Sequence, residues 1–344
     1  MKKILFSCIT LTFCIVSCTS QQSATATKKT NAGIETYINA IETNNLKTNL
    51  YVIASDEMQG RNTGEPGQKK AGEYIINQYK KLGISFPKGA DSYYQKVPSD
   101  FMKRGFSPKL NDSENIWAYI EGSEKPEEVL VISAHYDHVG MKNGEIYNGA
   151  DDDGSGTVGV MEIAKAFMKA KKEGHGPKRS ILFLHVTGEE HGLHGSRFYS
   201  ENPLFPLKNT IADINIDMIG RRDNLNPNDN NYIYVIGSDR LSSELHTINE
   251  EVNNKYTKLR LDYKYNDRND PEQIYYRSDH YNFAKKGIPA IFFFNGIHDD
   301  YHKPTDDVEK IEFDLLTKRA QLAFALAWEL ANRDQRIVVD RDGK

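Results

Sequence analysis

Residues 180–190 read SILFLHVTGEE, an apolar run that ends in two adjacent glutamates, Glu189 and Glu190. The run has the length and composition of a strand that is covered on both faces of a sheet. Similar runs predict strands at 114–122, 128–137, 211–220, 232–238 and 290–296, and helical spacing of apolar residues predicts helices at 32–55, 67–83, 156–172, 241–254 and 314–332. This alternation predicts a three-layer α/β fold, with a mixed, mostly parallel sheet and helices on both faces.

The composition is typical of a globular protein. The chain has 344 residues, of which 38% are apolar, and its 19 Tyr and 15 Phe argue against disorder. This length allows one large α/β domain or two smaller ones. The net charge of −4 comes from interspersed charges of both signs, without a basic stripe, so we expect no nucleic-acid partner.

The N-terminus is typical of a targeting signal. Lys2 and Lys3 precede a short apolar stretch, as in secretory signals. The stretch ends in Ile15-Val16-Ser17-Cys18, which resembles a bacterial lipoprotein processing site and predicts lipidation of Cys18. The alternative is an ordinary signal peptide in which Cys18 is incidental. We therefore expect an exported protein that a lipid anchors to a bacterial membrane, facing the periplasm.

The sequence also predicts how the chain is divided into segments and a domain. Residues 1–18 form the lipoprotein signal segment, and the Ser/Thr/Gln/Ala-rich residues 19–31 form a flexible tether. The folded domain spans 32–335, and 336–344 form a C-terminal tail. All three cysteines lie in the signal segment, so the folded domain has no disulfide framework.

Polar side chains follow several of the predicted strands at the point where each strand ends. They are His135 and Asp137, Glu189 and Glu190, Asp217 and, after the last strand, His302. In open α/β sheets, ligands bind outside the carboxyl ends of the strands. One such group is usually a surface residue, but acids and histidines at four strand ends together indicate a site.

A run of three aspartates, Asp151 to Asp153, precedes the predicted helix at 156–172. Adjacent carboxylates repel one another unless a cation neutralises them. The residues from Asp151 to Glu162 also fit an EF-hand calcium loop, but that motif needs a helix on each side. The upstream segment is instead a strand end and a Gly/Asn-rich loop, which favours a loop that carries an acid into the site.

Five motifs together make the chain similar to a known family. They are SAHYDHVG (133–140), GADDDGSG (149–156), TGEEHGLHGS (187–196), NIDMIG (215–220) and YHKPTDD (301–307). In this order they resemble the co-catalytic zinc aminopeptidases of metallopeptidase family twenty-eight, over roughly residues 40–335. The resemblance implies a zinc exopeptidase-like fold, two zinc or other divalent ions per chain, and peptide substrates with a free N-terminus.

The resemblance also implies a role for each matching residue. His135 and Asp217 hold one ion, Glu190 and His302 hold the other, and Asp152 bridges them. Asp137 orients His135, and Glu189 is the general base. Tyr301 matches a tyrosine that stabilises the oxyanion in some relatives, and Arg277 matches an arginine that touches substrate in some relatives.

Elementary chemistry supports these roles. Zinc binds histidine nitrogen and carboxylate oxygen, and catalytic zinc sites leave a position open for water. Three carboxylates and a bridging hydroxide balance the charge of two divalent ions, which lower the pKa of water toward about 7. Glu189 then passes the proton to the leaving amine. The other histidines near the motifs, His138, His191 and His194, receive no role, and His185 is expected to be a hydrogen-bonded core residue.

Two alternatives to a two-metal aminopeptidase stay open. A glutaminyl cyclase of the same fold keeps much of the metal set but uses a single zinc. A non-enzymatic binding module on this fold should have lost metal ligands. The intact DDDGSG motif at 151–156 favours the peptidase.

Overall fold

The computed structural model describes Met1, residues 33–103 and residues 109–343. The residues that carry the predicted signal, Cys18 and the tether lie outside this part of the chain, apart from Met1. The fold belongs to the unit that begins at Ala32. Within the described residues, no helix is both long enough and apolar enough to cross a membrane.

One sheet of eight strands forms the centre of the domain, in the order β1-β2-β6-β3-β7-β10-β8-β9. The four strands β6, β3, β7 and β10 are parallel to one another. The β1–β2, β2–β6 and β10–β8 pairs are antiparallel, and β9 pairs in parallel with β8. The bounds are β1 Tyr94–Val97, β2 Ser113–Ile120, β3 Lys125–His135, β6 Arg179–Val186, β7 Thr210–Ile216, β8 Tyr232–Ile236, β9 Arg260–Asp262 and β10 Ala290–Phe294. This confirms the prediction of a mixed, mostly parallel sheet.

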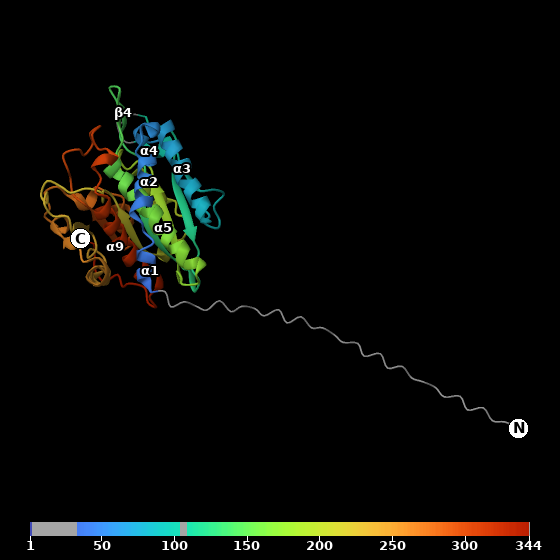
Figure 1. Ribbon diagram of the computed structural model, residues 1–344. Coiled ribbons are helices and arrows are strands. Elements are labelled where there is room, and N and C mark those ends of the chain that lie inside the picture. Colours follow the sequence, from blue (N-terminus) through green and yellow to red (C-terminus); the bar gives the residue numbers. More distant parts are fainter. Residues whose placement is uncertain (2–32, 104–108, 344) are drawn as a thin grey trace. The chain divides into compact units, whose positions relative to one another are not determined.

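Helices cover both faces of the sheet, which gives the three predicted layers (Figure 1). Helices α3 (Pro66–Leu82), α5 (Gly156–Lys172) and α9 (Phe313–Asn332) pack on one face, with α1 (Ile34–Ile38) and α2 (Thr43–Ile53) against α5 and α9. Helices α6 (His194–Glu201) and α8 (His280–Ala284) pack on the other. The remaining helices are α4 (Ser99–Met102) and α7 (Ser243–Val252), and a hairpin of β4 (Gly140–Lys142) and β5 (Glu145–Tyr147) projects beyond β3.

The apolar runs in the sequence reflect burial on both sides of the sheet. Along β3, Leu130 and Ile132 join the core under α3, α5 and α9, whereas Val129 and Val131 join the core on the opposite face. Successive side chains of a strand point to opposite faces, so both sets must be apolar where both faces are covered. This is why the central strands lack the alternation of a half-exposed sheet.

The predicted helices agree with the structure except near the N-terminus. The expected helix at 32–55 is two helices, because Glu42 takes an extended conformation and its carboxylate accepts a hydrogen bond from the Asn45 side chain. A new helix, α2, therefore begins at Thr43. Helix α3 ends at Leu82 and is followed by Gly83 in a left-handed conformation, which agrees with the predicted end of this helix at the glycine. At the other end of the chain, Ile337 is buried and Asp340 accepts a hydrogen bond from the Ser243 backbone, so the first part of the predicted tail packs on the domain.

Candidate metal centre and adjoining pocket

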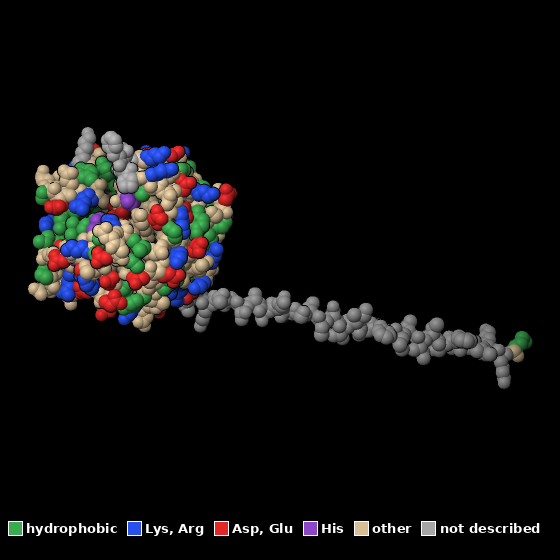
Figure 2. Space-filling model, turned by 90° about the horizontal axis from the view of Figure 1, so that it is seen from above, with side chains coloured by type: hydrophobic (Ala, Val, Ile, Leu, Met, Phe, Trp, Pro, Cys, Tyr) green, Lys and Arg blue, Asp and Glu red, His purple; other side chains and the backbone are tan. Residues whose placement is uncertain are grey.

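The site lies at the carboxyl edge of the four parallel strands. His135 is the last residue of β3, Asp217 follows β7, and Glu189 and Glu190 follow β6. His302 lies in the loop after β10. The parallel arrangement brings segments distant in sequence to one edge. Viewed from the β4 end, histidine side chains reach the surface close to acidic ones (Figure 2).

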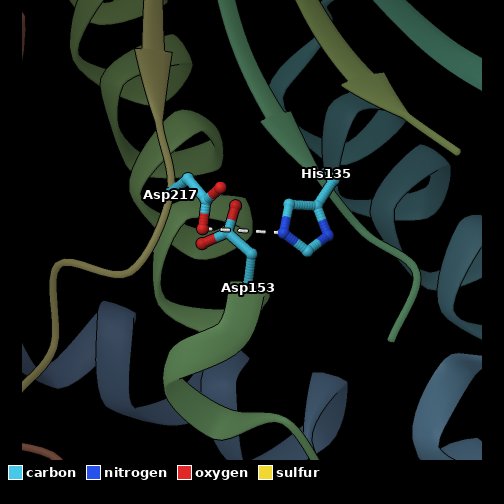
Figure 3. A group of neighbouring side chains, drawn as sticks. All are labelled: His135, Asp153 and Asp217. Carbon is cyan, nitrogen blue, oxygen red and sulfur yellow. Dashed lines mark ion pairs between the residues drawn. The ribbon is translucent and has the colours of Figure 1, made fainter. Parts of the chain in front are cut away.

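A first donor group consists of His135, Asp153 and Asp217, and their ligand atoms lie within 4.8 Å of one another. His135 and Asp217 point toward each other from two strand ends, and Asp153 rises between them from the segment before α5 (Figure 3). The His135 Nε2 atom lies 3.6 Å from Asp217 Oδ1. Ser278 donates a hydrogen bond of 2.6 Å to the other Asp217 oxygen, which fixes the orientation of the carboxylate.

A second donor group consists of His138, Asp152 and Glu190. His302 adjoins it, with Nε2 at 2.9 Å from Glu190 Oε2 and 3.0 Å from Asp152 Oδ2. The other Asp152 oxygen, Oδ1, lies 3.2 Å from Nε2 of His135 in the first donor group. One carboxylate therefore faces both groups, one oxygen to each.

Several atoms of the two groups are buried without a hydrogen-bond partner among the described residues. They are Nε2 of His135, both ring nitrogens of His138, and one carboxylate oxygen each of Asp152, Asp153 and Glu190. Buried polar atoms normally have partners. Here nitrogens and oxygens approach closely without hydrogen-bond geometry, as expected when they converge on a shared point rather than on each other. Imidazole nitrogen and carboxylate oxygen are zinc ligands, so the donor set fits this metal.

The three consecutive aspartates have different surroundings. Asp151 accepts a 2.6 Å hydrogen bond from the Gly220 backbone and faces His298, away from the donor groups. Asp152 lies between the donor groups. Asp153 accepts hydrogen bonds from the backbones of Gly156 and Met218, so it joins the start of α5 to the residue after Asp217. Of the three, only Asp152 faces both groups, and the other two fix the loop that carries it.

Asp137 contacts His135 mainly through its backbone. Nδ1 of His135 lies 3.0 Å from the Asp137 carbonyl oxygen and 3.8 Å from its carboxylate. The carboxylate instead accepts hydrogen bonds from the Thr63 hydroxyl, at 2.6 Å, and from the Glu189 backbone, at 3.2 Å. Asp137 thus orients His135 by its carbonyl and joins that histidine to the glutamate pair by its side chain.

The environment of Glu189 suits a proton acceptor. Burial raises the pKa of Glu189 well above its usual range, and the carboxylates of Glu190 and Asp217 act in the same direction, against the effect of His135. Its carboxylate lies 4.0 Å from Nε2 of His135. A raised pKa makes this carboxylate a stronger proton acceptor than an exposed glutamate.

A pocket with a cavity volume of about 40 Å³ adjoins the site. Three acids line it, Asp152, Glu189 and Asp217, together with the apolar or aromatic side chains of Met218, Ile274, Phe292, Phe294, Ile297 and Tyr301. The Tyr301 ring stacks on His302 at 3.9 Å between centroids, and Arg277 also lines the pocket, where its side chain is 42% exposed. The pocket therefore places an apolar surface beside a group of acids.

The structure brings the predicted residues His135, Asp152, Glu189, Glu190, Asp217 and His302 to one edge of the sheet, and it places Tyr301 and Arg277 in the adjoining pocket. Sequence reasoning gave no role to two further residues, Asp153 and His138. The aspartate run was a signal for the first, and the second histidine of the HYDH sequence at 135–138 was a signal for the other. His185 is the expected core residue, with Nε2 at 2.7 Å from the Tyr79 hydroxyl.

A family model agrees with this geometry, matching residues 115–327 with the description "Peptidase family M28". The chain belongs to peptidase family M28. A relative named "Probable leucine aminopeptidase", from Trichophyton verrucosum, is 31% identical over 226 residues, which cover 63% of this chain and 57% of that protein. The chain thus spans little more than half the length of this relative.

Solved structures share the fold. The zinc aminopeptidase BSAP from Bacillus subtilis matches with a TM-score of 0.65 at 17% identity, over 88% of this chain and 98% of that one. The glutaminyl cyclase of Porphyromonas gingivalis matches with a TM-score of 0.63 at 18% identity, over 83% and 97%. At such identities the likeness concerns the M28 fold, and the chemistry must be argued from the residues of the site.

Proposed function

We propose that the protein is a metal-dependent aminopeptidase that removes N-terminal residues from peptides and holds two zinc ions. The observation that carries the proposal is Asp152, whose two carboxylate oxygens face histidines of different donor groups at 3.2 and 3.0 Å. A carboxylate shared in this way is what a pair of adjacent cations requires. The aminopeptidase and zinc names of its relatives support the same reading.

In this proposal His135 and Asp217 hold one ion, Glu190 and His302 hold the other, and Asp152 serves both. Zinc in such a site polarises a carbonyl oxygen and lowers the pKa of water toward about 7. Ser278, by its hydrogen bond to Asp217, keeps the free oxygen of that carboxylate directed at the first donor group. Asp137 keeps the His135 ring in place through its carbonyl oxygen.

Glu189 is proposed as the general base. It lines the pocket, whereas Glu190 lies between His138 and His302. Its carboxylate accepts a proton from the attacking water and delivers it to the leaving amine. Tyr301 and Arg277 line the same pocket, which supports roles for both. In this proposal the Tyr301 hydroxyl donates a hydrogen bond to the carbonyl oxygen of the peptide, and Arg277 contacts the peptide.

The pocket supports a preference for hydrophobic N-terminal residues. A bound side chain would contact Met218, Phe292 and Phe294, while the free amine would lie near the acids that line the same pocket. Burial of an apolar side chain in such a pocket stabilises the complex by about 1.5–3 kcal/mol. Leucine, methionine and phenylalanine should therefore be better N-terminal residues than aspartate or lysine.

An assay on the purified protein tests this function. Zinc-loaded protein should release nitroaniline from leucyl-nitroanilide, cut peptides with a free N-terminus, and leave N-acetylated peptides intact. A chelator should abolish the activity. Cyclisation of N-terminal glutamine together with one bound ion would favour the glutaminyl cyclase, and metal binding without turnover of either substrate class would favour a binding module.

We also propose, from the sequence alone, that the protein is exported and anchored to a bacterial membrane through lipid on Cys18, facing the periplasm. The support is the lysine-led apolar segment that ends at this cysteine. Cys18→Ala should move the protein from the membrane fraction to the soluble fraction or block its processing. Unchanged fractionation and unchanged mass would contradict the anchor.

A further inference from the structure

His138 is a fully buried histidine that has no part in the proposed mechanism. It lies in the loop between β3 and β4, three residues after His135. Its Nδ1 atom is 2.7 Å from Glu190 Oε1 and 3.7 Å from Asp152 Oδ2. His302 contacts the same two carboxylates, at the other Glu190 oxygen, Oε2, and at the same Asp152 oxygen, Oδ2. The two imidazoles therefore flank one pair of carboxylates.

The contacts of His138 are not those of a hydrogen-bonded core histidine. Neither of its ring nitrogens has a hydrogen-bond partner among the described residues, and Glu190 Oε1 has none either, although it is only 2.7 Å from Nδ1. A buried imidazole without a partner loses the hydrogen bonds that water gave it. His185 shows the contrast, because its Nε2 is paired with the Tyr79 hydroxyl.

The surrounding backbone is shaped to admit the His138 ring. A Cβ atom on Gly149, whose φ is +57°, would lie 2.3 Å from the Asp152 carbonyl oxygen and 2.5 Å from two carbon atoms of this ring, so glycine is needed both for the turn and for the space beside the ring. The rings of His138 and His302 are 5.7 Å apart between centroids and inclined at 68°, so their edges and faces meet beside Asp152 and Glu190. The ring is thus closely packed beside the two carboxylates, with Nδ1 directed at Glu190.

We propose that Nδ1 of His138 is a further metal ligand, on the ion that Glu190 and His302 hold. This inference rests on the metal site of the proposed function. It gives that ion four protein donors, which is the number in a closed zinc site. The donors are His138, His302, Glu190 and the shared Asp152.

The proposal makes the two metal positions unequal. Asp217 of the first donor group lines the pocket, and so does Asp152, which faces both groups. His138 and Glu190 are not among the residues that line it. With His138 this ion has four protein donors, whereas the other ion has three, from His135, Asp217 and Asp152. The ion bound by His138 is therefore the more tightly held of the two.

Metal affinity and X-ray absorption of the zinc-loaded protein test the proposal together. His138→Gln should weaken the tighter zinc site by at least about 100-fold, the upper end of the effect of changes outside the ligand shell. The affinity of the weaker site should change far less. X-ray absorption should count three imidazoles over two ions in the wild type and two in the variant. His191→Gln is the matched control, because His191 neighbours Glu190 in sequence but contacts Asn62.

The outcomes separate this inference from the proposed function. Unchanged zinc affinities in the His138→Gln protein would overturn the role of His138 as a ligand. A weaker zinc affinity with an unchanged imidazole count would also overturn it, because His138 would then only orient Glu190. A wild type that binds no zinc overturns the proposed function itself. If His138→Gln does not fold, as judged by circular dichroism without metal, His138→Asn is measured instead, and the imidazole count is read in the same way.

Discussion

At the scale of single residues, the two adjacent glutamates after β6 have separate surroundings. Glu189 lines the pocket, and Glu190 contacts two imidazoles. Glu189→Gln keeps the shape of the side chain but cannot accept a proton, so kcat should fall by about 10²-fold or more while zinc content stays unchanged. Glu190→Gln should lower zinc content, with activity partly restored by excess zinc. Steady-state kinetics and elemental analysis measure both effects.

The reverse result would exchange the two roles. If Glu189→Gln lost zinc and Glu190→Gln kept it, the ligand would be the first glutamate of the pair. Unchanged turnover in both variants would place the site elsewhere. Thermal unfolding of each metal-free variant is the control, because a role in folding alone would lower the unfolding temperature without zinc.

The sequence predicts those residues of the candidate site that lie at the ends of predictable strands. His135, Asp217 and the glutamates follow apolar runs, so their position at one edge follows from the topology of a parallel sheet. The position of His138 does not follow in this way. It lies in an irregular loop, and its contact with Glu190 depends on the space that Gly149 leaves, which no periodicity encodes.

At the scale of elements, long helices could be predicted from the sequence, whereas short strands could not. The predicted helix at 156–172 has those bounds in the structure, because a full amphipathic pattern specifies it. The short edge strands β1 and β9 were not predicted, because strands of four and three residues carry too few side chains for a pattern. Their pairing depends on the neighbouring strand instead.

Arg61, at the end of the 3₁₀ segment Asp56–Arg61, connects elements that carry the site. Its buried guanidinium donates hydrogen bonds to the carbonyl oxygens of Ile53, Tyr136, Asn148 and Gly149, at 2.7–2.9 Å. Arg61→Met leaves these acceptors unsatisfied and should lower the free energy of unfolding by about 3–5 kcal/mol, as for other broken buried charged contacts. Urea unfolding measures the change, and a loss below 1 kcal/mol would contradict this role.

His185 on β6 should make stability depend on pH. Burial lowers the pKa of His185 to about 3, whereas an unfolded histidine has a pKa of about 6.5. Between these values the unfolded chain binds a proton that the folded chain does not, so stability falls as the pH falls from about 6.5. The slope from this residue is about 1.4 kcal/mol per pH unit. His185→Gln should remove that part of the slope between pH 6 and pH 5 in urea unfolding. Equal slopes in the variant and the wild type would contradict the assignment.

At the scale of the whole molecule, metal should stabilise the fold, because the donor residues come from β3, the segment before α5, the ends of β6 and β7, and the loop after β10. Without a cation these segments hold buried carboxylates against one another. Zinc at 1,000 times its dissociation constant adds about 4 kcal/mol to the free energy of unfolding. Chelation should therefore lower the unfolding temperature by several degrees, and zinc should restore it. Asp152→Asn should lose most of the zinc effect, because Asp152 faces both donor groups. Arg336→Gln should keep it, because Arg336 is exposed and contacts Lys208 and Thr210 at the start of β7, whereas Asp217 follows the end of that strand. An unfolding temperature that zinc leaves unchanged would mean that the donor groups do not hold the metal in the folded state.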